Sequence, residues 1–249
     1  MDLSSVGFGL LALAIIAIAL GSIFKGLTGV GLPILAVPLM ASFTSVENAV
    51  VLMVLPGLAA NGLVVLTHRK WQLLAEHKSF LVLGFAGGFL GTWLLSTMGD
   101  RWLKLLLAIW LGIYLVQYFS RGRGSPVTRV PRWLANILGA SAGTIQGATG
   151  ISAPIVGPYF HAAGLTRSSY AFAAACTFLL FSVAQFMTMT RVGLLTPDRL
   201  TIGLIAVLPT LLFTQLGIRF SGRISDLAFN RILVVLFVLM ELKLVVDIL

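Results

Sequence analysis

The sequence is dominated by apolar runs that are long enough to cross a lipid bilayer as helices. Spanning about 30 Å of hydrocarbon takes roughly 20 apolar residues in a helix. Only 10% of the 249 residues are charged and 58% are hydrophobic, so a soluble domain of this length would leave much apolar surface without a core. We therefore predict an all-α polytopic membrane protein, with eight membrane helices at 6–24, 45–67, 79–98, 102–119, 133–148, 168–190, 199–220 and 227–247.

Two shorter apolar segments, 32–43 and 153–165, lie between these predicted helices. Each is too short to span the bilayer, and each begins beside a glycine-rich break. Irregular backbone at membrane depth must be buried in protein or line a cavity. The pattern is therefore typical of a re-entrant segment or a half-helix, and we predict one in each half of the chain.

The chain contains an internal repeat. KGLTGVGLPI, at residues 25–34, aligns with QGATGISAPI, at residues 146–155, and five of the ten positions are identical. A weaker similarity pairs Leu90-Gly91 with Leu216-Gly217. Duplication is the usual construction of secondary transporters. We predict a first repeat at 1–120, a polar cytoplasmic linker at 121–132 and a second repeat at 133–249.

The distribution of lysine and arginine predicts the orientation of the chain, because basic loops tend to stay in the cytoplasm. With eight spans, the loops near 68–78, 120–132 and 191–199 would share a face with both termini, and this face carries more basic residues than the other. We therefore expect both termini in the cytoplasm. Four spans in each half would make the repeats parallel, whereas five, with the short segments crossing as well, would make them inverted.

The small residues of the repeated blocks are the first candidates for a binding site. Glycine and proline interrupt helices, and a helix that begins within the membrane presents free N–H groups and a positive dipole end to an anion. Interrupted helices at matching positions of two repeats point to a substrate site. Alternatively, small residues only allow close helix packing. The candidates are Gly26, Thr28, Gly29, Gly31, Pro33, Gly147, Thr149, Gly150, Ser152 and Pro154.

Four larger polar residues complete the predicted substrate site. Lys25 begins the first block, and Gln146 occupies the matching place in the second. Lys25 could neutralise an anion, or its amine could reach the lipid headgroups from the end of the first helix. Asn61 in the second predicted helix and Gln185 in the sixth could hydrogen-bond the ligand or join neighbouring helices.

The sequence offers no set of residues that we interpret as catalytic. HExxH and P-loop patterns are absent, and the single cysteine, Cys176, excludes an intramolecular disulfide and a multi-cysteine metal cluster. The net charge of +9 comes from basic residues that are scattered between apolar runs, so we expect no nucleic-acid partner. We expect no enzymatic activity, metal or cofactor, and the expected partners are the lipid bilayer and a small anion.

At the repeated blocks the sequence resembles the sulfite exporter TauE/SafE family, also called the 4-toluene sulfonate uptake permease (TSUP) family. The resemblance rests on GSIFKGLTGVGLPILAVPL and AGTIQGATGISAPIVGPYF, and it extends in length and layout over nearly the whole chain. The chain has Leu32 and Ser152-Ala153 where further glycines often stand in the family. The resemblance implies a carrier in a bacterial-type plasma membrane, the inner membrane, for sulfite, sulfoacetate or an organosulfonate, in either direction.

The resulting hypothesis is alternating access, with the two repeats moving about a site that both blocks line. A coupling proton or cation could drive the movement. Glu241 is the clearest acidic residue within the predicted spans, and we expect it to pair with Lys243 or with an arginine of another helix. Two alternatives stay open: a membrane subunit or sensor that does not transport, and a passive anion channel.

Overall fold

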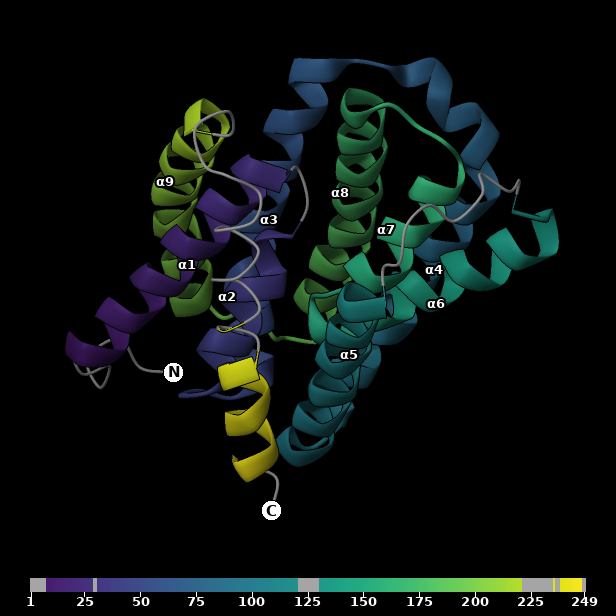
Figure 1. The fold of residues 1–249 in the computed structure, drawn as a ribbon. Helices are drawn as coiled ribbons and strands as arrows, with labels where there is room; N and C mark the ends of the chain where they lie inside the picture. The colour runs from purple at the N-terminus through teal and green to yellow at the C-terminus, as the bar shows by residue number, and fades with distance from the viewer. Residues whose placement is uncertain (1–7, 29–30, 121–129, 221–234, 236–237, 248–249) are drawn as a thin grey trace.

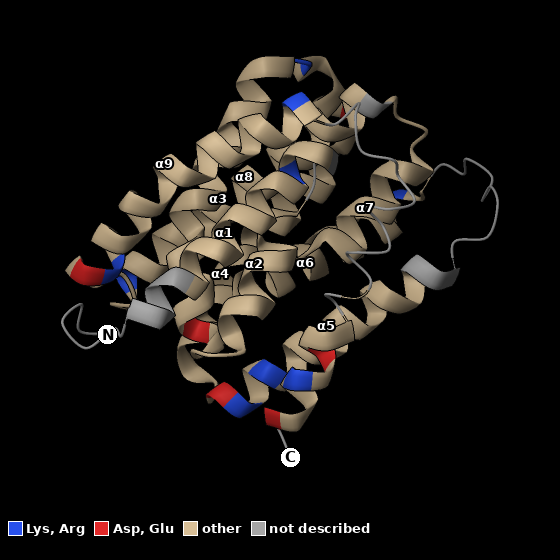
Figure 2. Ribbon diagram, turned by 60° about the vertical axis from the view of Figure 1, so that its left-hand side comes forward, with Lys and Arg blue, Asp and Glu red and all other residues tan. Residues whose placement is uncertain are grey.

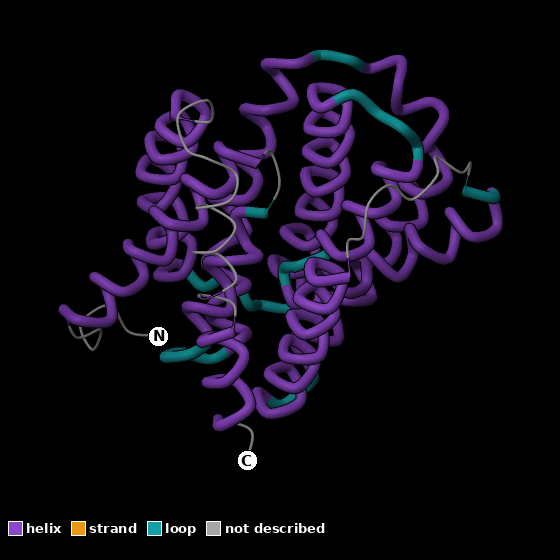
Figure 3. Tube along the Cα trace, viewed as in Figure 1, coloured by secondary structure: helices purple, strands orange, loops and turns teal. Residues whose placement is uncertain are grey.

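The computed structural model describes residues 8–28, 31–120, 130–220, 235 and 238–247, which form helices joined by loops and contain no strand (Figures 1 and 3). The helices are α1 (Phe8–Thr28), α2 (Leu32–Ala41), α3 (Val46–His68), the 3-10 helix η2 (Trp71–His77), α4 (Lys78–Thr97), α5 (Asp100–Ser120), α6 (Arg132–Thr149), α7 (Ala153–Ala162), α8 (Arg167–Arg191) and α9 (Pro197–Phe220). Residues 238–247 are also helical.

The observed helices agree with the predicted ones. Seven of the predicted long helices and both predicted short segments are helical, with ends that differ by a few residues. The first helix continues to Thr28 instead of ending near residue 24, because Lys25 is accommodated inside the protein. Of the eighth predicted helix, residues 227–234 lie outside the described residues.

The outer surface of the molecule requires lipid as its solvent. Four helices are long and apolar enough to cross a membrane, namely Val46–His68, Trp71–Thr97, Ser168–Arg191 and Pro197–Phe220. Most charged residues lie toward the two ends of the bundle (Figure 2), and large apolar side chains between these ends are exposed. The chain is therefore a multi-pass membrane protein. By this criterion the described residues do not reach the predicted number of eight spans.

The short helices α2 and α7 begin in the interior of the molecule. α6 ends at the turn residue Gly150 and α7 begins at Ala153, and both residues line an interior cavity, the central cavity, with Lys25 of α1. At the other end of this hairpin, Arg132 of α6 and Ala163 after α7 line a second cavity together. α7 therefore returns to the end of the bundle from which α6 started. The break between α1 and α2 also lies at the central cavity, because Lys25 and Gly31 line it.

The corresponding long helices of the two halves, α3 and α8, run antiparallel. Lys70, just after α3, donates hydrogen bonds from Nζ to the hydroxyl groups of Ser168 and Ser169 at the start of α8. At the opposite end, Arg199 of α9 forms an ion pair of 2.8 Å with Glu47 in the first turn of α3. Figure 1 shows the segment that follows α3 and the loop that leads into α8 at the same end of the bundle.

This arrangement corrects part of the predicted topology. The loop 68–78 and the start of α6 do share a face, here called the linker face, because His77 and Arg132 line the same cavity. Arg199, in the loop region predicted to join them, lies instead at the opposite face, beside the first turn of α3. The reason is that the α6–α7 hairpin starts at the linker face and returns to it. Every later helix therefore ends on the side opposite to the one predicted.

The C-terminal helix also ends at the face opposite the linker face. Asp247 forms an ion pair of 3.6 Å with Lys104 of α5. The start of α5 lies beside the start of α3, since Asp100 accepts a hydrogen bond of 2.8 Å from the N–H group of Val46. The C-terminal helix therefore does not share a face with 68–78, contrary to the prediction.

The closest helix contacts join the two halves, with α6 packed on α4 and α1 packed on α9. Glycine makes these contacts possible. A Cβ atom added to Gly143 of α6 would overlap the carbonyl oxygen of Gly84 in α4, and one added to Gly91 would overlap that of Thr144. Backbones that approach this closely gain van der Waals contact, which is the main attraction between helices in lipid.

A close glycine contact also occurs at positions that the internal alignment pairs, namely Gly26 with Gly147 and Gly91 with Gly217. Gly26 of α1 lies on Gly217 of α9, and Gly147 of α6 lies on Gly91 of α4. The first helix of each half thus packs on the third long helix of the other half. For Gly26 and Gly147 the structure favours the close-packing alternative over a place in the binding site.

We expect Gly143→Ala to lower the free energy of unfolding by about 1–3 kcal/mol, because the added methyl group forces α4 and α6 apart. Gly62→Ala is the matched control, since a Cβ at Gly62 of α3 meets nothing within 4 Å. Thermal unfolding of both purified variants in detergent measures the difference. Equal stability of Gly143→Ala and the unchanged chain would contradict this account of the α4–α6 contact.

Candidate functional site

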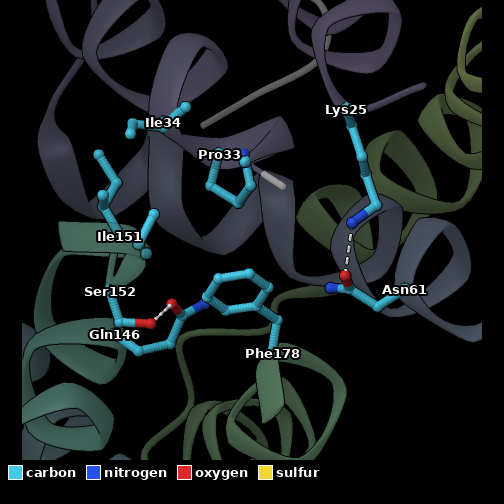
Figure 4. Close-up of a pocket in the computed structure, with 11 residues that line it drawn as sticks. Lys25, Pro33, Ile34, Asn61, Gln146, Ile151, Ser152 and Phe178 are labelled. Atoms are coloured by element: carbon cyan, nitrogen blue, oxygen red, sulfur yellow. Dashed lines mark hydrogen bonds between the residues drawn. The ribbon is translucent and has the colours of Figure 1, made fainter. Parts of the chain in front are cut away.

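The central cavity lies where the two helix interruptions meet (Figure 4). Its volume is about 10 Å³, which is near the smallest volume that holds one water molecule. The structure therefore shows the cavity closed around its lining. The lining residues are Lys25, Gly31, Pro33, Ile34, Asn61, Gln146, Gly150, Ile151, Ser152, Ala153 and Phe178.

Lys25 brings a charged group into this interior site. Its side chain is 2% exposed, and Nζ donates a hydrogen bond of 2.6 Å to Oδ1 of Asn61, which is itself 3% exposed (Figure 4). Among the described residues, no Asp or Glu forms an ion pair with Lys25. Burying a cation is costly unless a counter-charge is present. The neutral amide of Asn61 compensates only part of the charge, so an anion would complete the site.

The opposite wall of the cavity carries neutral hydrogen-bonding groups. Ser152 donates a hydrogen bond of 2.8 Å from its hydroxyl to Oε1 of Gln146, and both side chains are buried. Figure 4 shows this pair facing Lys25 and Asn61 across the ring of Phe178. The side-chain amide of Gln146 also carries N–H groups, which can donate to a ligand in the cavity.

The positive ends of two helices also point toward the central cavity. α2 and α7 both begin there, and each has a proline, Pro33 or Pro154, in its first turn. Proline suits this place because the first turn needs no N–H donor for the helix itself. The helix dipoles add positive potential at these N-termini.

α6 ends at the same cavity, and its negative end is covered by donors. Gln185 of α8 donates hydrogen bonds of 3.2 Å from Nε2 to the backbone oxygens of Gln146 and Gly147. The N–H group of Gly150 also donates to the oxygen of Gln146. At the end of α1, the ammonium group of Lys25 stands in the last turn. The combined field of the cavity lining is therefore positive.

Two glycines allow the sharp changes of direction at the interruptions. Gly31 precedes α2 with φ of 92°, and Gly150 follows α6 with φ of 73°. L side chains rarely adopt this left-handed conformation. At Gly31 a Cβ would also stand 2.7 Å from a methyl carbon of Ile34, so space and conformation both require glycine there.

The structure brings seven of the predicted site residues together in the cavity lining. The amine of Lys25 points to Asn61 in the interior and not to the lipid headgroups. The seven are Lys25, Gly31, Pro33, Asn61, Gln146, Gly150 and Ser152.

The remaining predicted residues lie around the cavity without lining it. Thr149 shapes the turn, since its hydroxyl accepts a hydrogen bond of 3.2 Å from the N–H group of Ile151. Pro154 is buried in the first turn of α7, and Gln185 covers the end of α6. Thr28 is the last residue of α1, and Gly29 lies outside the described residues.

Four lining residues were not predicted from the sequence: Ile34, Ile151, Ala153 and Phe178. All four are apolar residues in a mostly apolar chain, so their type carries no signal. The first three stand next to predicted residues in the repeated blocks, and adjacency to Pro33 or Ser152 would have found them. Phe178 comes from α8, where only the fold brings it to the cavity.

Glu241 lies outside this site, and no described residue forms an ion pair with it. Lys243 forms an ion pair of 3.1 Å with Asp247 instead. Oε2 of Glu241 is buried and has no hydrogen-bond partner among the described residues. On α5, a Cβ added to Gly112 would stand 3.6 Å from Oε1 of Glu241.

A bundle of lipid-exposed helices with interrupted helices around a closed, positively polarised cavity defines a membrane protein with an interior site for a small ligand. Residues 13–244 match the family Sulfite exporter TauE/SafE, and the chain belongs to this family. Its members are membrane transporters of sulfur anions and not enzymes. No match was found among curated proteins or among solved structures.

We expect Asn61→Leu to lower the free energy of unfolding by about 2–3 kcal/mol, because it leaves the buried amine of Lys25 without its hydrogen-bond partner. Adding Lys25→Met should restore most of this loss, since the double variant contains neither polar group. The free energies of unfolding of the two single variants and the double variant, measured in detergent, complete this double-mutant cycle. If the losses simply add, the two side chains are not coupled as described.

Proposed function

We propose that this protein is a secondary transporter that moves a small sulfur-containing oxyanion, such as sulfite, sulfoacetate or an organosulfonate, across the plasma membrane by alternating access. The observation that carries the proposal is the buried amine of Lys25, which has no acidic partner among the described residues and faces a cavity where two helices begin. The family supports the class of substrate, and the cavity supports its negative charge.

The energetics of the central cavity favour an anion over a neutral ligand. A negative charge about 4 Å from an ammonium group is stabilised by about 4 kcal/mol at an effective dielectric constant of 20. Sulfite and sulfonate groups present three oxygens. Lys25, the amide of Gln146 and the hydroxyl of Ser152 supply donors on two walls of the cavity. We propose these three side chains and Asn61 as the first contacts of the substrate.

The packing of the two halves supports alternating access with inverted repeats. α3 and α8, the long helices that follow the short helices α2 and α7, run antiparallel. The interruption of α1–α2 and that of α6–α7 meet at one cavity. A site between two inverted halves can be exposed first to one face and then to the other when one half rocks against its partner. The small volume of the cavity corresponds to a closed stage between these two states.

We also propose that the linker face is cytoplasmic. Lys70, Lys78 and Arg132 belong to this face, and the sequence of the linker itself adds Arg121, Arg123 and Arg129. Basic loops tend to remain in the cytoplasm. This orientation keeps the predicted cytoplasmic linker and puts the C-terminal helix end at the outer face, beside Lys104.

The closed cavity favours a carrier over a passive channel. A channel needs a continuous water-filled path, whereas the central cavity holds about one water molecule. A subunit that only binds partners would have no need of a buried lysine without a counter-charge.

We expect the unchanged chain in proteoliposomes to take up radiolabelled sulfite or a sulfonate with saturable kinetics. Lys25→Met should reduce kcat/KM by about 100-fold or more, because the substrate loses its main counter-charge. Lys243→Met is the matched control, since the Lys243 side chain is 50% exposed and remote from the cavity lining. It should transport at the normal rate.

The outcomes separate the candidate functions. Saturable flux that Lys25→Met retains would remove Lys25 from the substrate site. Flux that rises linearly with concentration would favour a channel. Absence of flux for every sulfur anion under every imposed gradient, with the protein monodisperse and folded, would reject the proposed transport function.

A further inference from the structure

A second cavity opens at the linker face, at the end of α7 that is remote from the central cavity, and its volume is about 700 Å³. Lys78 and Arg132 contribute positive charge to its lining, against one carboxylate, Glu76. Lys78 and Arg132 are also the first residues of α4 and α6, so two helix N-termini border the cavity. The lining of this linker-face cavity suits an anion.

α7 connects the linker-face cavity to the central cavity. Ala153 at its start lines the central cavity, and Tyr159 near its end lines the linker-face cavity. The helix has ten residues, which is a length of about 15 Å. A route along α7 would therefore join the linker-face cavity to the cavity that Lys25 lines.

Aromatic rings close the structure around the outer half of α7. Tyr159 stacks on Phe80 of α4, with ring centroids 4.0 Å apart, and its hydroxyl lies 2.9 Å from Nδ1 of His77. His77 meets Phe160 edge to face, with centroids 5.1 Å apart. Stacked and edge-to-face rings attract each other beyond the gain from burial. These four residues, called the ring cluster below, hold α7 against the start of α4.

α7 is packed more loosely than α2, its counterpart in the first half. α2 makes extensive contacts with α1 and α3, whereas α7 contacts α5, α6 and α8 more sparsely, although most residues of both helices are buried. Each helix contains a proline, Pro38 in α2 and Pro158, directly before Tyr159, in α7. Proline removes one backbone donor and weakens the helix at that point. The outer half of α7 can therefore tilt while its start stays at the central cavity.

One polar atom of the ring cluster favours such a movement. His77 is 8% exposed, and its Nε2 is buried without a hydrogen-bond partner among the described residues. A buried polar atom without a partner raises the free energy of the arrangement that contains it. Separation of the rings would give Nε2 access to water or to an anion. Opening would therefore remove the free-energy cost of the buried, unpaired Nε2 atom.

We propose that the transported anion reaches the central cavity through the linker-face cavity, and that Tyr159, held by His77 and Phe80, is the gate that tilting of α7 opens. α2 is the static counterpart at the opposite face in this conformation. The identity of the ligand rests on the proposed function, whereas the gate is a property of the helix and can be tested without transport.

The test follows the access of an anionic methanethiosulfonate reagent to the central cavity, on the full chain in lipid nanodiscs. The one native cysteine is removed by Cys176→Ala, and Ser152→Cys places a thiol of similar size in the cavity lining. Adding Tyr159→Leu should make modification of this thiol at least about tenfold faster, because the closed state loses both the ring stack and the hydrogen bond.

Three further variants separate opening of the gate from general loosening. Tyr159→Phe keeps the ring and removes the hydroxyl, so its effect should lie between those of the unchanged residue and leucine. Phe85→Leu removes a ring from another aromatic pair of α4, Phe85 with Phe89, and should leave the rate unchanged. A thiol at Ser42→Cys, buried just after α2, should react at the same rate with and without Tyr159→Leu.

Faster modification at position 152 alone supports the gate. An unchanged rate at 152, or an equal acceleration at 152 and 42, would overturn it. The sulfite uptake assay is a separate readout. Faster modification in a protein that transports no sulfur anion would keep the gate and reject the substrate, whereas normal sulfite uptake with unchanged modification would reject the gate alone.

Discussion

The structure depends on one constraint: backbone groups at the two helix interruptions must find partners inside the protein, because lipid supplies none. Gln185 donates to the end of α6, the hydroxyl of Thr149 accepts from the turn, and prolines remove one donor from the first turn of α2 and of α7. The groups that remain face the central cavity. The interruptions therefore impose a polar interior on an otherwise apolar bundle, and this interior is the candidate site.

Close glycine contacts hold the two interruptions together. α6 packs on α4 and α1 packs on α9, so each half packs against the other. These contacts leave no room for side chains, and residues near the ends of α1 and α6 line the same cavity. The rigid glycine contacts contrast with the sparse packing of α7. The glycine contacts maintain the site, and the sparse packing of α7 allows access to it.

The sequence predicted the helices and most of the cavity lining, but not how the chain crosses the membrane. Apolar length determined the elements, and the repeated Gly-Thr-Gly blocks identified the interruptions, because both signals are local. Topology depends on whether α7 continues or returns, which apolar composition does not reveal. Gly26 and Gly147 were assigned to the site, since glycine has the same signature at a turn and at a helix contact. Phe178 was missed because only tertiary packing brings it to the cavity.

The pairing of α1 with α9 has a consequence for biosynthesis. α1 emerges from the ribosome first, yet the surface that covers Gly26 belongs to α9, which begins at Pro197. Until that helix is inserted, the first hairpin exposes backbone and small residues in the translocon or to lipid. Contacts between distant parts of a chain form late. The contact between α1 and α9 can therefore form only after α9 has been inserted, and the small-residue surface around Gly26 stays uncovered by α9 until then.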